Sequence, residues 1–276
     1  MTLDTLLMLL CMEGITLQMI RKGREVIGDP QSFQAWRAAL EILLPHPLER
    51  GELEQTTRNM KKVKREMSRG GVCALLPEDE RFPKALLRLE EPPLVLFALG
   101  NLDALTLPLI AAVGTREPSE QGLAQAGRVG RALGRSGAAV VSGLAVGCDA
   151  GIHQGCLEVG GIPIAVLPSG VLRCYPPANR CLYHRIMQEN GLVISEYLPT
   201  AWVGPHVFCQ RDRLISGLGR AVVMVEPRPD KVLRRAVTQA LEQQQPVGAC
   251  LGAHGAMRDL GEDEALNRFI AEALGA

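Results

Sequence analysis

Short apolar segments alternate with longer amphipathic segments through the middle of the chain. Five apolar runs have the length of buried strands: 109–113, 138–142, 162–167, 191–195 and 220–225. Between the first three, residues 120–135 and 149–159 carry apolar side chains at helical spacing. Strands that alternate with helices favour a parallel sheet covered on both faces. We therefore predict an α/β fold with an extended, Rossmann-like, mostly parallel sheet over residues 71–250.

The two ends of the chain lack this alternation. In the first 70 residues apolar positions recur at helical intervals, with breaks at 28–30 and 45–47. We predict a small all-helical domain over residues 1–70. Residues 251–276 are Gly-rich and then acidic with helical spacing, which predicts either a closing helix or a mobile tail.

A cluster of basic residues ends the helical region. Six cations accompany a single acid, Glu66, in this segment: Arg58, Lys61, Lys62, Lys64, Arg65 and Arg69. A charge run of this kind is typical of a solvated helix face, which is the interpretation we favour. The alternative is a strip that contacts nucleic-acid phosphates.

The overall charge does not indicate a polyanionic partner. Lys+Arg and Asp+Glu number 30 each, so nucleic-acid binding would need a local basic patch. Hydrophobic residues make up 47% of the chain, which is enough for a buried core. The first residues lack a basic region and are too short a run for a membrane-spanning helix. We therefore expect a cytoplasmic protein that does not contact a membrane.

Cysteine usage agrees with this location. The eight cysteines are scattered and include no Cys-x-x-Cys pair. We expect reduced thiols that mostly fill the core. We expect no metal site, because zinc sites need ligand pairs at close spacing.

A glycine-rich turn between a predicted strand and the helix that follows it is the first candidate site. Gly143, Ala145 and Gly147 are small enough for a phosphate to approach the backbone. The start of the helix supplies unpaired N–H donors and a partial positive charge. Ser142 adds a hydroxyl, and we expect Asp149 to cap the helix. The alternative is an ordinary strand-to-helix turn of an α/β protein.

Two further strand ends carry residues of the same kind. Gly114 permits a tight exit, Thr115 offers a hydroxyl, and Arg116 has a forked cation suited to phosphate oxygens. The third predicted strand is followed by Ser169 and Gly170. Because the carboxyl ends of parallel strands share one edge of the sheet, we expect these turns to form a single anion-binding crevice.

The segment Arg211-Asp212-Arg213 precedes a helix-like run at 214–218. Its two guanidinium groups could contact a phosphodiester backbone. Alternatively, Asp212 caps the helix, and an ion pair with an arginine holds the helix start.

Three other polar residues belong to the same set of turns and helices. His153 lies one helical turn after the expected capping aspartate, and we predict a structural, hydrogen-bonded histidine rather than a catalytic one. Glu196 and Glu226 each follow a predicted strand. They could line the crevice, or they could pair with Arg116 or Arg211.

Together these motifs resemble the DNA-processing protein A family, also called Smf or DprA. The resemblance is carried, in consistent order and spacing, by 81–86, 92–100, 114–116, 142–149 with His153, Tyr175-Pro176 with Asn179, Ser195-Glu196 and 211–218. It spans roughly residues 75–226. It implies the family's Rossmann-like core, preceded by a leader that resembles a sterile-alpha-motif or helix-hairpin-helix domain.

The chain departs from the family pattern at several positions. Asp212 stands where the family usually has asparagine, which places a negative charge beside the expected anion site. The run 231–237 replaces the family's Ser-Gly-Ser-Leu-x-Thr-Ala stretch, so Lys231, Arg234 and Arg235 could substitute cations for hydroxyls. We also expect a divergent member without the winged-helix tail found in many relatives.

The resemblance implies a non-catalytic protein that binds single-stranded DNA, acts in DNA recombination and natural transformation, and loads the RecA recombinase. It also implies a homodimer, and we expect no catalytic residue, no metal and no cofactor. Phosphates would contact the small turn residues and Arg116, with Arg211 and Arg213 beside them. Aromatic residues make up only 4% of the chain, so backbone contacts would dominate over base stacking.

Two other functions stay open. The related lysine-decarboxylase-like (LOG) group cleaves nucleoside monophosphates on a similar sheet, with a Pro-Gly-Gly-x-Gly-Thr-x-x-Glu run. No such run occurs in this chain, so hydrolysis is disfavoured. The main alternative is a small-nucleotide sensor on the same fold, and the other is a degenerate scaffold that binds partner proteins.

Overall fold

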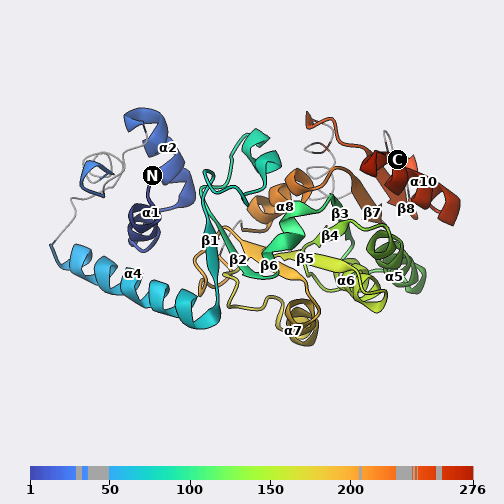
Figure 1. The fold of residues 1–276 in the computed structure, drawn as a ribbon, viewed down its shortest axis with the longest axis horizontal. Coiled ribbons are helices and arrows are strands. Elements are labelled where there is room, and N and C mark those ends of the chain that lie inside the picture. Colours follow the sequence, from blue (N-terminus) through green and yellow to red (C-terminus); the bar gives the residue numbers. More distant parts are fainter. Residues whose placement is uncertain are drawn as a thin grey trace.

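The structure is a computed structural model that describes residues 1–28, 33–36, 50–204, 207–227, 238, 240, 242–252 and 257–275. Nine strands of these described residues form one sheet in the order β1-β2-β6-β5-β4-β3-β7-β8-β9 (Figure 1). Their bounds are Cys73–Leu75 (β1), Leu96–Gly100 (β2), Leu109–Gly114 (β3), Ala139–Ser142 (β4), Ile162–Val166 (β5), Leu192–Ser195 (β6), Val222–Val225 (β7), Val247–Cys250 (β8) and Arg258–Asp259 (β9).

The strand order places three turns at one edge of the sheet. From β6 through β5, β4, β3, β7 and β8 to β9 all neighbouring strands are parallel, whereas β1 and β2 join the β6 edge in antiparallel fashion. The chain moves outward from β3 to β6 and then crosses to β7 on the other side of β3. The predicted α/β class and mostly parallel sheet are confirmed, and the carboxyl ends of β3, β4 and β5 lie side by side.

Helices cover both faces of the sheet. One face carries α5 (Glu120–Arg135), α6 (Cys148–Glu158) and α7 (Arg180–Gln188), and the other carries α8 (Val207–Leu218) with the short 3-10 helix η1 (Lys84–Arg88) (Figure 1). Two further 3-10 turns are η2 (Leu102–Thr106) and η3 (Pro177–Asn179). Ile110 and Ala112 of β3 pack in the α5–α6 layer, while Ala111 between them packs in the α8 layer. Both faces are therefore buried, which explains the uninterrupted apolar runs.

The N-terminal region is helical, as predicted. Its described helices are α1 (Leu3–Leu10), α2 (Leu17–Ile27) and α4 (Arg50–Gly70). The hydroxyl of Thr16 accepts from the backbone N–H of Met19 at 3.2 Å and caps α2. One apolar cluster joins these helices to the sheet, since it contains Trp36 of the leader and Phe97 of β2. The division of the chain into units at residues 70 and 250 stays a prediction.

The C-terminal segment forms a closing helix, the first of the two predicted alternatives. The helix α10 spans Asp263–Leu274 and buries Leu266, Phe269 and Ile270 in the same apolar cluster as α5. Strand β9 precedes it and extends the sheet beside β8.

The cysteines fill the core less than predicted. None of the eight, all of which lie in the described ranges, forms a disulfide; only Cys148, Cys156 and Cys250 are buried, and Cys181 is exposed. Burial raises the pKa of the Cys156 thiol to about 12.

In the ranges that the structure describes, no helix has both the length and the apolar character needed to cross a membrane.

Candidate functional site

A small pocket of about 70 Å³ lies where the turns after β3, β4 and β5 meet. It is lined by Arg116, Gly143, Ala145, Val146, Pro168, Tyr175, Pro176, Phe208 and Arg211. The first of these residues follows β3, the next three follow β4, and Pro168 follows β5. The three predicted turns therefore share one pocket, and α8 closes it from the other side.

Gly147 allows the first two turns to pack against each other. It has a φ of +83°, and a side chain there would lie 2.7 Å from the carbonyl oxygens of both Thr115 and Arg116. The N–H of Cys148 donates to the carbonyl of Thr115 at 3.1 Å. A glycine is required here for backbone geometry and for close approach. Gly147 and Thr115 thus build the wall that positions Arg116.

Asp149 joins the same two turns and does not cap the helix, so that prediction is wrong. The N-cap of α6 is Gly147, and the helix begins one residue before Asp149. The buried carboxylate accepts from the N–H of Gly114 and from the N–H of Ala145, each at 3.3 Å. Burial raises the pKa of Asp149, and the nearby guanidinium of Arg211 opposes that shift.

Arg211 forms the floor of the pocket. Its Nη1 donates to the carbonyl of Gly143 at 2.6 Å and to that of Val166 at 3.2 Å. Its Nε lies 2.8 Å from Oδ1 of Asp212, and only 4% of the side chain is exposed. A side chain at position 143 would collide with this guanidinium at 1.6 Å, so Gly143 leaves the space that Arg211 occupies. The charge of Arg211 is already shared between Asp212 and the more deeply buried Asp149.

The segment Arg211-Asp212-Arg213 lies inside α8 rather than before a helix, which corrects the sequence prediction. The helix begins at Val207, so Asp212 is not a cap and pairs with Arg211 instead. Residues two apart on a helix point to opposite sides. Arg211 therefore faces the pocket while Arg213 faces away from it.

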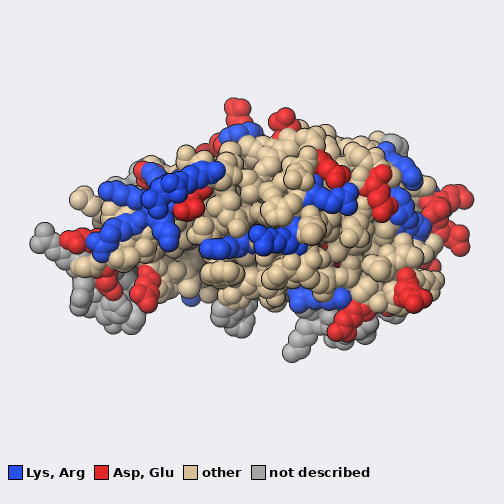
Figure 2. All heavy atoms as spheres, turned by 90° about the horizontal axis from the view of Figure 1, so that it is seen from below, with Lys and Arg blue, Asp and Glu red and all other residues tan. Residues whose placement is uncertain are grey.

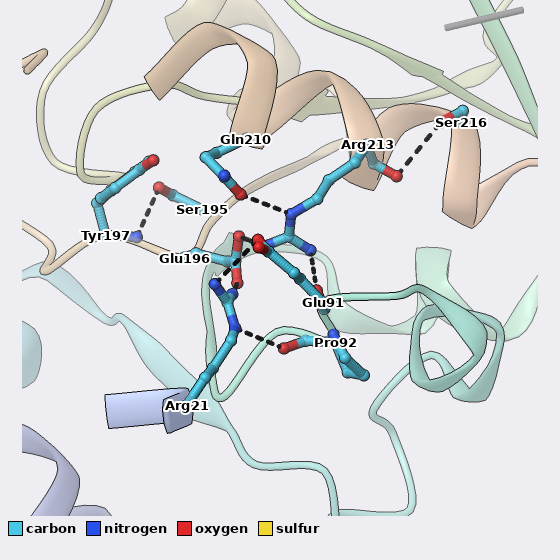
Figure 3. A network of polar contacts seen from close by, with 9 residues as sticks. All are labelled: Arg21, Glu91, Pro92, Ser195, Glu196, Tyr197, Gln210, Arg213 and Ser216. Carbon is cyan, nitrogen blue, oxygen red and sulfur yellow. Dashed lines mark hydrogen bonds and ion pairs between the residues drawn. The ribbon is translucent and has the colours of Figure 1, made fainter. Parts of the chain in front are cut away.

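Arg213 belongs to a buried ion-pair network on the far side of α8 (Figure 3). Its guanidinium pairs with Glu196. It also donates from Nε to Oε1 of Gln210 at 3.0 Å and from Nη1 to the carbonyl of Glu91 at 2.7 Å. Arg21 of α2 reaches the other carboxylate oxygen of Glu196 at 3.0 Å. Burial raises the pKa of Glu196, and both guanidinium groups oppose that shift.

The two glutamates at strand ends do not line the pocket. Glu196 pairs with Arg213 and Arg21, rather than with either arginine that we predicted as its partner. Glu226 accepts from the N–H and the hydroxyl of Ser119 at 2.9 and 3.1 Å, next to the start of α5. Its carboxylate therefore lies where the helix dipole favours negative charge. The residues Lys231, Arg234 and Arg235 lie outside the described part of the chain.

His153 and Ser142 are buried behind the pocket. Neither ring nitrogen of His153 nor the hydroxyl of Ser142 has a hydrogen-bond partner among the described residues. The predicted hydrogen-bonded role of His153 is therefore not what the structure shows. Burial, reinforced by the positive charge of Arg211, lowers the pKa of His153 to about 3, so the ring is neutral.

Ser169 and Gly170 hold the turn after β5 in place through backbone contacts. The hydroxyl of Ser169 donates to the carbonyl of Arg173 at 2.5 Å, and the carbonyl of Ser169 accepts from Ser195 Oγ at 2.7 Å. Gly170 packs on the backbone of Leu198, where a side chain would be 2.1 Å from its carbonyl oxygen. Four of the twelve predicted site residues line the pocket: Arg116, Gly143, Ala145 and Arg211. The other eight do not: Gly114, Thr115, Ser142, Gly147, Asp149, Ser169, Gly170 and Arg213.

Two aromatic residues of the pocket were not predicted as site residues. The Arg116 guanidinium lies over the Phe208 ring at 4.8 Å, and Tyr175 lies 5.8 Å from the same ring. Arg116 is exposed, and the ion pairs found among the described residues do not include it. Tyr175 entered the sequence argument only through the family resemblance. The signal for Phe208 was its position on the helix turn before Arg211.

The exposed guanidinium of Arg116 beside small residues gives the pocket a chemistry suited to an anion. Within the described ranges no group of three His, Cys, Asp or Glu residues could hold a metal ion. The basic face of α4 is a second concentration of positive charge, with Arg58, Lys61, Lys62, Arg65 and Arg69 exposed (Figure 2). Lys64 instead pairs with Asp4 of α1 at 2.6 Å.

Most of the chain is similar in sequence to known proteins. The family model for DNA recombination-mediator protein A matches residues 74–274. The Smf protein of Synechocystis sp. is 42% identical over 159 residues, which are 56% of this chain and 40% of that protein. The DNA processing protein DprA of Streptococcus pneumoniae is 35% identical over 175 residues, 63% of this chain and 61% of that protein. The chain thus spans about half the length of the curated relatives it matches.

Two solved structures share the fold over a large part of the chain. The X-ray structure of DprA from Streptococcus pneumoniae has a TM-score of 0.71 and 26% identity, and the match covers 98% of this chain and 93% of that one. A structure concerned with the single-stranded DNA binding mode of DNA processing protein A from Helicobacter pylori has a TM-score of 0.62 and 26% identity, and covers 74% and 96% of the two chains.

Proposed function

Because the chain belongs to the DNA recombination-mediator protein A family, we propose that it binds single-stranded DNA, with a backbone phosphate in the pocket at the carboxyl edge of its sheet. The Helicobacter pylori relative is described by its single-stranded DNA binding mode, which supports the proposal. The observation that carries it is Arg116, an exposed guanidinium stacked on Phe208 at 4.8 Å and directed at a pocket of small residues.

The charges around the pocket make Arg116 the main phosphate contact. Arg211 is buried and shares its charge with Asp212 and Asp149, so little of its charge is left for a ligand. Arg116 carries no such partner among the described ion pairs, and its forked donors match phosphate oxygens. Gly143 and Ala145 leave the backbone open to a phosphate beside it.

The size of the pocket favours a strand over a free nucleotide. A site that encloses a small molecule usually has about 300–1,000 Å³. The pocket has about 70 Å³, which suits one phosphate group of a chain that continues over the surface. This argues against the small-nucleotide sensor that the sequence left open.

The wider role rests on the family. We propose that the protein acts in DNA recombination during natural transformation, in the cytoplasm, where it loads RecA on the bound strand as a homodimer. Light scattering measures the mass of the free protein. RecA filament assembly on single-stranded DNA, with and without the protein, tests the loading step.

The direct test is Arg116→Ala. We expect the affinity for a thymidine oligonucleotide, measured by fluorescence anisotropy, to fall about tenfold or more, because a charged hydrogen bond is lost. The salt dependence between about 50 and about 200 mM should also become shallower, by about 0.7 in slope for the lost phosphate contact. The fold should be intact, because Arg116 is exposed.

Arg135→Ala is the matched control. Arg135 is also exposed, but it lies at the end of α5, and α5 leads away from the carboxyl edge of the sheet. Equal affinities for the Arg116 variant and the parent protein would refute the proposed role. Saturation by a mononucleotide without DNA binding would favour the sensor, and binding of neither would favour the scaffold.

A further inference from the structure

Trp202 is the most exposed large hydrophobic residue that the structure describes. Its side chain is 76% exposed, whereas Trp36, the other tryptophan of the chain, is fully buried. An isolated exposed indole loses the stabilisation that burial would give, so its environment calls for an explanation. The guanidinium of Arg173 lies over the face of the indole, at 4.5 Å from the ring centroid.

The backbone around Trp202 is held in place by hydrogen bonds to the turn after β5. The N–H of Gly170 donates to the carbonyl of Ala201 at 2.9 Å, and the N–H of Leu172 donates to that of Pro199 at 2.8 Å. Arg173 adds a longer contact from Nε to the carbonyl of Thr200 at 3.4 Å. The indole therefore projects from an ordered backbone, and Arg173 fixes one side of the ring.

The turn after β5 that holds the Trp202 segment also contributes to the pocket. Pro168, two residues before Gly170, and Tyr175, two residues after Arg173, both line it. The stacked pair of Trp202 and Arg173 thus belongs to a turn that reaches the pocket, where Arg116 stacks on Phe208. The two pairs have the same composition, an arginine over an aromatic ring.

This combination is suited to a nucleobase. Every base has an apolar face that stacks on an aromatic side chain, and arginine adds a cation–π contribution. We propose that Trp202, backed by Arg173, is a stacking platform for a base of the strand whose phosphate occupies the pocket, an inference that rests on the proposed function. The scarcity of aromatic residues does not oppose stacking, since Tyr175 and Phe208 already line the pocket.

The test uses Trp202→Ala and Trp202→Phe in the full chain. We expect Trp202→Ala to weaken binding of a thymidine oligonucleotide about tenfold, as for other lost base–aromatic stacks. Trp202→Phe should retain most of the affinity because the ring is kept. The salt dependence should not change, since no phosphate contact is lost. An abasic oligonucleotide should bind the parent protein and Trp202→Ala equally.

Tryptophan fluorescence gives an independent measurement. Because Trp36 is fully buried, oligonucleotide binding should quench the emission of Trp202, and Trp202→Phe should abolish that quenching. The platform is refuted if Trp202→Ala binds the oligonucleotide as tightly as the parent protein does and the parent shows no quenching on binding. The pocket proposal then still stands, because the parent binds the oligonucleotide. If the parent protein binds no single-stranded DNA, the proposed function itself fails.

Discussion

At the scale of single residues, His153 is a titratable group that the fold removes from water. It is fully buried on α6, and its two ring nitrogens have no hydrogen-bond partner among the described residues. Arg211 adds a positive charge nearby, so protonation in the folded state is opposed twice. A buried polar group without partners costs free energy that an apolar side chain would not.

His153→Leu should therefore reduce the acid sensitivity of the protein. The pKa of His153 is lowered from 6.5 to about 3, so below about pH 6 the unfolded chain binds a proton that the folded state excludes. The free energy of unfolding falls as the pH drops through this window, by about 1.4 kcal/mol per unit. Urea unfolding at several pH values between 4 and 7 should show a flatter dependence for the variant.

His184→Leu, at an exposed position of α7, is the control and should keep the pH dependence of the parent protein. Identical slopes for His153→Leu and the parent would show that His153 binds its proton equally well in the folded and unfolded states, which contradicts the lowered pKa.

The turns after β3 and β4 were predicted better than the glutamates at strand ends or most residues on helices. Arg116 and Gly143 line the pocket as expected, because the end of a buried strand fixes where the next residues lie. The direction of a helical side chain depends on where the helix begins. Because α6 begins at Cys148 and α8 at Val207, the roles predicted for Asp149 and Arg213 were wrong. The sequence alone does not determine where each helix begins, and therefore which way its side chains point.

At the scale of elements, α5 and α6 pack unusually closely through glycines. A side chain at Gly155 of α6 would lie 2.2 Å from the carbonyl oxygen of Gly127 on α5, and one at Gly130 would lie 2.1 Å from that of Ile152. The two helices therefore meet backbone to backbone. This contact positions the start of α6, which forms the wall of the pocket.

Gly155→Ala should destabilise the fold despite the better helix propensity of alanine. The new methyl group meets backbone rather than a mobile side chain, so the helices must separate. Overpacking of this kind costs about 1–3 kcal/mol, against about 1 kcal/mol gained in propensity. We expect a Tm several degrees lower by calorimetry, and weaker DNA binding because the pocket wall shifts.

Gly127→Ala is the matched control on the partner helix. Its methyl group would meet only the flexible guanidinium of Arg131, at 3.3 Å. This variant should be as stable as the parent or more so. A Tm change of the same sign and size in both variants would contradict the close-packing argument.

The elements themselves were largely predictable where the sheet is buried on both faces. All five predicted strands are present, because a central strand needs a continuous apolar run. The strands β1, β2, β8 and β9 were not predicted. Strands β1 and β2 pair in antiparallel fashion at one edge of the sheet, and β9 has only two residues. Such short strands at the edges of a sheet leave little periodicity in the sequence.

At the scale of the whole molecule, the helical leader is tied to the sheet by charge as well as by apolar packing. Arg21 of α2 reaches across to Glu196 at the end of β6, and Arg213 of α8 holds the same carboxylate (Figure 3). The side chains of Arg21 and Glu196 are 13% and 1% exposed, so solvent screens this contact little. The leader, the end of β6 and α8 thus meet at one buried carboxylate.

Arg21→Met tests whether this contact holds the leader in place. We expect a loss of stability of about 2–3 kcal/mol, because Glu196 keeps only one of its two charge partners. Backbone amides of α1 and α2 should exchange with deuterium faster than those of β3–β5.

Lys64→Met is the control, because the side chains of Lys64 and its partner Asp4 are 41% and 64% exposed. A surface pair contributes about 0–1 kcal/mol, and less at high salt. Equal losses in the two variants, or unchanged exchange in α2, would show that apolar packing alone attaches the leader.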